Sequence, residues 1–220
     1  MNYVLIVAGG VGKRMNSQVP KQFLMLDDKP ILYYTVHKFL QALPDYKIIL
    51  VLPADTFSTN CFLAEYFPEQ ENIIAISGGE TRFHSVQNGL NVIEGDGLVL
   101  IHDGVRPFVS DDVLKRCIQT ASSNGNAIPC VALNDSLRCI DGEHSIALDR
   151  TNYRSVQTPQ TFRIAEIKQA YEQTYQVSFT DEAAVYEAIG GKINIVEGND
   201  ENIKITTPQD LVLAEYFIKL

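Results

Sequence analysis

The fold is indicated first by residues 3–15, which read YVLIVAGGVGKRM. The apolar run from Tyr3 to Val7 does not alternate with polar residues, as expected of a strand buried on both faces of a parallel sheet. The glycines that follow let the backbone approach a ligand closely, and successive N–H groups in such a loop can cradle a phosphate. The stretch therefore predicts a first strand that ends in a phosphate-binding loop.

Two familiar glycine motifs do not fit this loop. The dinucleotide-binding fingerprint needs a small third residue, where this chain has Met15. A Walker A loop fails at both outer positions, which hold Val7 and Arg14. Arg14 and the nearby Lys21 carry the remaining signal, because Arg grips phosphate oxygens with a planar fork and Lys adds a point charge.

Similar apolar runs recur and alternate with helical patterns. Strands are predicted at 48–52, 73–77 and 98–102, and helices at 30–43, around 83–93, after Ser110, and from Thr207 to the end. This alternation predicts an α/β fold with a doubly wound, mostly parallel Rossmann-like sheet. Residues 136–154 break the rhythm with a turn signal at Asp141-Gly142, which predicts a projecting β-hairpin arm. We expect residues 1–220 to form one domain that carries this arm.

The composition excludes several classes of protein. The net charge of −9 argues against a general nucleic-acid binder, and no apolar stretch approaches the ~20 residues that span a bilayer. The first residues lack the basic and apolar regions of a signal peptide. The four cysteines form no C-x-x-C pair, so we expect free thiols and a cytoplasmic location.

Six motifs then occur in a fixed order along the chain. They are residues 8–15 with 20–22, 78–86, 102–107, 157–162, 180–183 and 202–208. The first resembles the N-terminal signature of the sugar-phosphate nucleotidyltransferases. The whole set, which covers nearly all of the chain, is similar to the 2-C-methyl-D-erythritol 4-phosphate cytidylyltransferase family of the non-mevalonate isoprenoid pathway.

The resemblance implies a role for each matched position. Transition-state stabilisation is implied for Arg14 and Lys21. Nucleotide binding is implied for Ala8, Gly9, Gly10, Gly12, Gly79, Glu80, Arg82 and Ser85. Binding of the polyol phosphate is implied for Asp103, Arg106, Ser136 and Thr158, and substrate positioning for Arg150 and Lys204.

The resemblance also implies partners and a cofactor. CTP and a polyol phosphate are the expected substrates, Mg²⁺ the expected cofactor and Asp103 a candidate metal ligand. The hairpin arm is expected to reach a second subunit, which makes a homodimer with shared sites. Ser136 stands where the family usually has Thr; it keeps the hydroxyl and loses the methyl group.

The implied reaction needs no protein nucleophile, because a phosphate monoester is already largely ionised at neutral pH, with a second pKa of about 6. Positioning and cations would supply the catalysis. His102 is therefore expected to be structural. Two alternatives remain open: a ribitol 5-phosphate cytidylyltransferase, and a non-catalytic nucleotide-sensing module. The sensing module is disfavoured because a site without turnover should have lost at least one charged residue, and all five are present: Arg14, Lys21, Asp103, Arg106 and Lys204.

Overall fold

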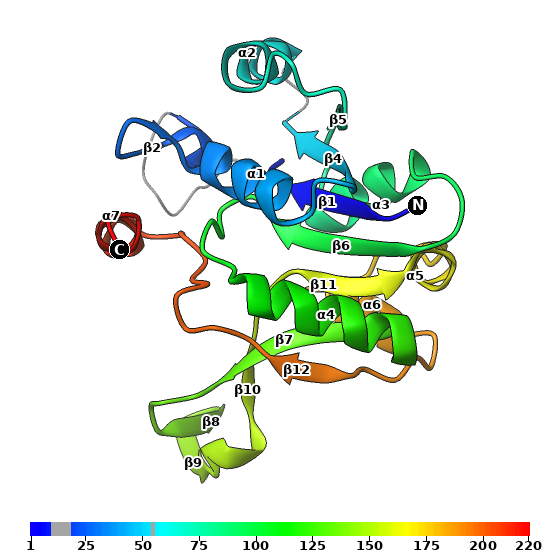
Figure 1. The fold of residues 1–220 in the computed structure, drawn as a ribbon. Helices are drawn as coiled ribbons and strands as arrows, with labels where there is room; N and C mark the ends of the chain where they lie inside the picture. The colour runs from blue at the N-terminus through cyan, green and yellow to red at the C-terminus, as the bar shows by residue number, and fades with distance from the viewer. Residues whose placement is uncertain (10–18, 54–55) are drawn as a thin grey trace.

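The computed structural model describes residues 1–9, 19–53 and 56–220, and it is built around one mixed sheet with helices on both faces (Figure 1). The sheet strands are β1 (Tyr3–Val7), β4 (Lys47–Leu52), β5 (Ile73–Ser77), β6 (Leu98–Asp103), β7 (Asn126–Ala132), β10 (Arg154–Val156), β11 (Gln160–Arg163) and β12 (Ile195–Glu197). The longer helices are α1 (Ile31–Ala42), α2 (Thr56–Tyr66), α3 (Arg82–Asn91), α4 (Asp111–Asn124) and α7 (Pro208–Phe217), and the shorter ones are α5 (Ile164–Ala170) and α6 (Glu182–Glu187).

The sheet order is β10-β7-β11-β6-β1-β4-β5, with β12 paired to β7. The strands β6, β1, β4 and β5 are parallel, whereas β11 runs antiparallel to both β6 and β7. The predicted mostly parallel α/β sheet is therefore confirmed. The antiparallel β11 was not predicted, because it is short and carries the polar residues Gln160 and Thr161, both of which are buried.

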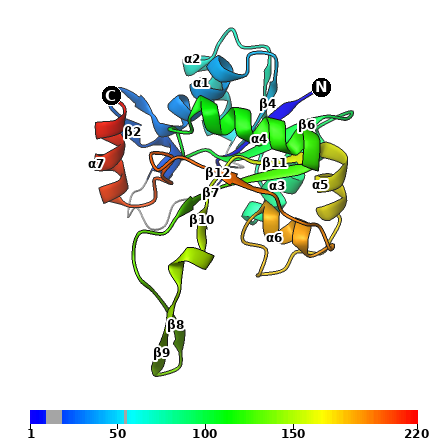
Figure 2. The same ribbon diagram turned by 60° about the horizontal axis from the view of Figure 1, so that its bottom comes forward.

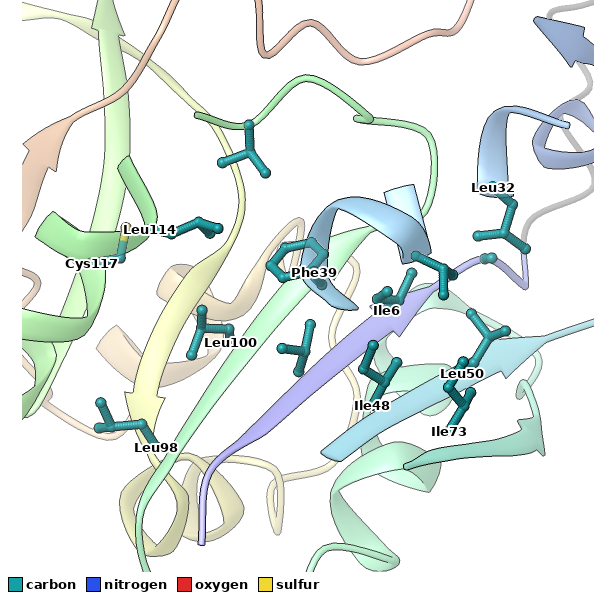
Figure 3. Close-up of a cluster of buried hydrophobic side chains, with 14 of the residues drawn as sticks. Ile6, Leu32, Phe39, Ile48, Leu50, Ile73, Leu98, Leu100, Leu114 and Cys117 are labelled. Atoms are coloured by element: carbon teal, nitrogen blue, oxygen red, sulfur yellow. The ribbon is translucent and has the colours of Figure 1, made fainter. Parts of the chain in front are cut away.

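Two apolar clusters lie on opposite faces of the sheet. On one face α1, α2 and α4 pack against alternate residues of the central strands, such as Val4 and Ile6 (Figure 3). On the other face α3, α5 and α6 pack against the intervening residues, such as Tyr3 and Leu5. Because both faces of β1 are covered, its side chains are apolar at every position.

Helix capping follows the sequence closely. The Ser110 hydroxyl accepts from the Val113 N–H at 3.2 Å, as predicted for the start of α4. Thr207 and Asp210 form a reciprocal capping box at the start of α7, with Pro208 in the first turn. The last helix was predicted to run to the end of the chain, but it ends at Phe217.

The predicted hairpin arm projects from one end of the sheet (Figures 1 and 2). Its strands are β8 (Leu137–Asp141) and β9 (His144–Leu148), joined by a turn in which Gly142 has φ of 58°. The paired strands of the arm occupy residues 137–148 of the predicted 136–154, and Arg154 at the end of that range belongs to β10 in the main sheet. A separate two-stranded ribbon, β2 (Met25–Leu26) with β3 (Lys29–Pro30), lies before α1.

Candidate active site

The larger of two adjoining cavities lies at the carboxyl ends of the parallel strands, where open α/β sheets bind their ligands. Its volume is about 400 Å³. The register of the sheet sets Val7 of β1 directly beside Asp103 of β6, so the segments after these strands meet there. The residues predicted from the sequence that line it are Ala8, Gly9, Lys21, Gly79, Glu80, Arg82, Ser85, Asp103 and Lys204.

Small residues allow the strand ends to pack closely on the start of α3. The buried Ser85 hydroxyl accepts from the Gly79 N–H at 3.0 Å. A Cβ atom on Gly79 would lie 2.4 Å from the Cβ of His84, and one on Gly9 would lie 3.3 Å from the Ser85 Oγ. Glycine is therefore needed at position 79 to keep this wall of the cavity in place.

Asp103 is a buried carboxylate that contacts three cations. Its Oδ1 lies 3.4 Å from Arg82 Nε, and its Oδ2 lies 3.1 Å from Arg106 Nε and 3.0 Å from Lys204 Nζ. Burial alone would raise the pKa of Asp103, but Arg82, Lys204 and Arg106 outweigh it and hold that pKa well below its ordinary value. Asp103 is thus a fixed negative charge that gathers the cations of the site.

A chain of hydrogen bonds fixes the turn that follows β6. The Thr158 hydroxyl accepts from the Asp103 N–H at 3.1 Å and lies 3.0 Å from His102 Nδ1, while His102 Nε2 lies 2.9 Å from the Arg106 carbonyl oxygen. Since a carbonyl only accepts, Nε2 carries the proton and Nδ1 accepts from Thr158. Burial lowers the pKa of His102 to about 4, so its ring is neutral and serves the structural role predicted for it.

The smaller cavity, of about 190 Å³, lies next to the larger one. Arg106, Thr158 and Thr180 line only this cavity, whereas Arg82, Asp103 and Lys204 line both. We call these three shared residues the dividing wall. The structure therefore brings the described nucleotide-binding residues, and Asp103, Arg106 and Thr158 of the predicted polyol-phosphate site, to a common group of charges.

Other predicted residues are not brought to these cavities. Ser136 and Arg150 are exposed beside the arm, and the Arg150 guanidinium donates to the Asn134 carbonyl oxygen. Neither side chain lines either cavity within this chain. The remaining predicted residues, Gly10, Gly12 and Arg14, lie outside the described part of the chain.

Two residues of the site were not singled out in the sequence. Gln22 is buried, lines the larger cavity, and donates from Nε2 to the Ala8 carbonyl oxygen at 2.6 Å. Glu182 is fully buried against Arg82. Both stand inside motifs that carried the resemblance, so their position in a motif was the available signal.

The described residues do not form a metal-binding cluster of three or more His, Cys, Asp or Glu side chains. Both oxygens of Asp103 already face cations, and this arrangement does not favour Asp103 as a metal ligand. Within the same described residues, the helices are all too short or too polar to cross a membrane.

A glycine-rich sequence directly after β1, a nucleotide-sized cavity at the strand ends and a cluster of cations define an α/β protein of the nucleotidyltransferase type. The sequence model of the IspD family, 2-C-methyl-D-erythritol 4-phosphate cytidylyltransferase, matches residues 2–220. The chain belongs to this family.

Individual relatives agree with this assignment. The chain is 47% identical to the 2-C-methyl-D-erythritol 4-phosphate cytidylyltransferase of Bacteroides thetaiotaomicron, with 96% of each chain covered. It is 44% identical to the enzyme of the same name from Phocaeicola vulgatus, with 98% and 99% covered. The crystal structure of 4-diphosphocytidyl-2C-methyl-D-erythritol synthase from Anaerococcus prevotii matches with a TM-score of 0.84 at 28% identity, and 100% and 96% are covered.

Proposed function

We propose that this chain transfers CMP from CTP to the phosphate of 2-C-methyl-D-erythritol 4-phosphate and releases pyrophosphate. The observation that carries the proposal is the dividing wall, because Arg82, Asp103 and Lys204 border both cavities. CTP fits the larger cavity and the polyol phosphate the smaller one, so that the two phosphates would meet beside Arg82 and Lys204. The family match favours methylerythritol phosphate over ribitol phosphate as the acceptor.

The chemistry proposed is a direct displacement at phosphorus. An oxygen of the polyol phosphate bonds to the α-phosphorus of CTP while the bond to the bridging oxygen breaks, and pyrophosphate leaves with the electron pair. No base is needed, since the attacking oxygen is already ionised. The protein's part is to align two anions and to stabilise the charge that develops between them.

Lys21 and Arg14 are proposed as the transition-state cations. Lys21 begins a 3₁₀ turn, Lys21–Phe23, at the wall of the larger cavity, which supports a contact with the triphosphate. Arg106 and Lys204 would hold the acceptor phosphate on the other side. Arg106 and Lys204 are held by Asp103 before any substrate binds, which avoids their reorganisation during the step.

Mg²⁺ is proposed as a cofactor that the triphosphate oxygens hold. The described protein residues do not fit a protein-held ion, since they lack a ligand cluster and Asp103 is engaged by cations. Mg²⁺ held in this way would neutralise charge on the phosphates and would need few protein ligands.

We further propose a homodimer in the cytoplasm. The β8–β9 arm carries the exposed apolar side chains Ile140 and Ile146, which support contact with another subunit. Arg150 and Ser136 lie outside the two cavities of their own chain, as expected if they complete the site of a partner. The four cysteines are free, which suits a reducing compartment.

Phosphorus NMR of the reaction mixture tests the activity. With CTP, Mg²⁺ and 2-C-methyl-D-erythritol 4-phosphate, we expect one pyrophosphate per acceptor consumed and a new pair of coupled diphosphate resonances. UTP in place of CTP should react far more slowly. Formation of CDP or inorganic phosphate instead would contradict transfer of a nucleotidyl group.

A further inference from the structure

The carboxylate of Glu182 is fully buried at the start of α6 and belongs to a short chain of polar contacts. Arg82 donates from Nη1 to Oε1 and from Nη2 to Oε2, the second at 3.0 Å. The Tyr171 hydroxyl lies 3.2 Å from Oε1 and donates to it. A carboxylate buried this completely is retained only with such partners, because its desolvation is otherwise too costly.

Arg82 is held from two sides. Its terminal nitrogens face Glu182, and its Nε lies 3.4 Å from Asp103 in the dividing wall. Burial would lower the pKa of Arg82, but the carboxylates of Glu182 and Asp103 outweigh it and raise that pKa. The guanidinium plane is therefore fixed by two carboxylates, and such paired contacts set orientation as well as charge.

The surroundings of Glu182 are themselves rigid. The Tyr171 ring stacks on Phe83 with centroids 4.6 Å apart and an interplanar angle of 22°. The Asp181 carboxylate accepts from Gln160 Nε2 at 2.9 Å and from the Ala184 N–H at 3.0 Å. Glu182 is thus bonded to Tyr171, the residue that follows α5, and its chain neighbour Asp181 is tied to Gln160 on β11.

We infer that Glu182 is a positioning residue, which fixes the Arg82 guanidinium in the dividing wall so that Arg82 meets the phosphates of both substrates in one orientation. This inference rests on the proposed function for its effect on turnover. The charges of this group also suit an anionic substrate. Three cations and two carboxylates leave it with a net positive charge; its members are Arg82, Arg106, Lys204, Asp103 and Glu182.

Kinetics of Glu182→Gln, alone and combined with Arg82→Met, test the inference. Glu182→Gln keeps the shape but weakens the hold on Arg82, so kcat/KM for the polyol phosphate should fall on the order of 100-fold. In the Arg82→Met background the same change should have almost no further effect. Glu187→Gln, an exposed carboxylate on the same helix, is the matched control and should leave kcat/KM unchanged. An equal loss in both backgrounds would overturn the inference.

A readout without substrate separates this inference from the proposed function. The Arg82 Nε–H resonance should exchange slowly in the wild-type protein and in Glu187→Gln, and should broaden or exchange rapidly in Glu182→Gln. Tyr171→Phe removes a single bond to Glu182 and should give an intermediate exchange rate. This variant provides the test if Glu182→Gln fails to fold. An unchanged Arg82 resonance in Glu182→Gln and in Tyr171→Phe would overturn the inference, whatever the enzyme's substrate proves to be.

Discussion

The Nζ atom of Lys204 lies 3.0 Å from Oδ2 of Asp103, which joins the segment before α7 to the end of β6. Arg106 shares the same oxygen at 3.1 Å and also donates to the Asn202 carbonyl oxygen at 2.8 Å. The last part of the chain is thereby fastened to the centre of the site. A single buried carboxylate thus serves both the stability of the fold and the arrangement of its cations.

Asp103→Asn should therefore be costly. The change leaves three cations without their shared counter-charge, and we expect the free energy of unfolding to fall on the order of 3 kcal/mol. Urea unfolding measures the loss. Asp112→Asn is the control, because Asp112 is paired with Lys115 only at the exposed surface, where the effect should stay below about 0.5 kcal/mol. Equal stability of the two variants would contradict the central role of Asp103.

His102 should make stability depend on pH. Its folded pKa of about 4 lies below the ordinary value of 6.5, so between these values the unfolded chain binds the extra proton. Stability should be full near pH 7 and fall by about 2 kcal/mol toward pH 5. His102→Asn should lose this component, and His144→Asn, on the exposed arm, should retain it. An identical pH dependence in all three proteins would show that His102 is not buried in its neutral form.

Lys21 is expected to act in the transition state. Lys21→Met should lower kcat on the order of 100- to 1000-fold, since one lost electrostatic stabiliser costs about 3–4 kcal/mol, and KM should change little. The same result is expected for Arg14→Ala. Steady-state kinetics measure kcat and KM separately, and Lys115→Met, at an exposed lysine, is the control. A raised KM with an unchanged kcat would assign Lys21 to ground-state binding.

The arm should control assembly. Ile140 and Ile146 are 71% and 62% exposed, and replacing both with Asp should convert a dimer into a single chain of 24.5 kDa. Light scattering after gel filtration gives the mass, and activity should fall with it. Val177→Asp, at an exposed apolar residue outside the arm, is the control. A wild-type protein that is active as a monomer would refute the shared site.

Much of the fold was readable because local signals were strong. Unbroken apolar runs identified the parallel strands β1, β4, β5 and β6, and the cap residues Ser110 and Thr207 identified the starts of helices. The antiparallel β11 was not readable, since its partners on β6 and β7 are set by tertiary packing. In the sequence, Gln160 is typical of a polar loop. In the structure it is buried, and its side chain is bonded to Asp181 and Ala183.

The sequence predicted which residues belong to the site, but it did not predict how their side chains contact one another. The resemblance named Asp103, Arg106 and Lys204, but their sharing of one carboxylate depends on segments that are distant in the sequence. The contact of Glu182 with Arg82 spans 100 positions and leaves no local pattern. The sequence likewise did not predict that the Thr158 hydroxyl would bond within the protein, to the Asp103 N–H and the His102 ring.

Pyrophosphate release with CTP and Mg²⁺, measured in parallel with 2-C-methyl-D-erythritol 4-phosphate and D-ribitol 5-phosphate, tests the central claim most directly. We predict a much higher kcat/KM with the first acceptor. A preference for ribitol 5-phosphate would contradict the assigned substrate while leaving the roles of the cations intact. The absence of pyrophosphate release with either acceptor would contradict the enzymatic function and would favour a nucleotide-sensing role.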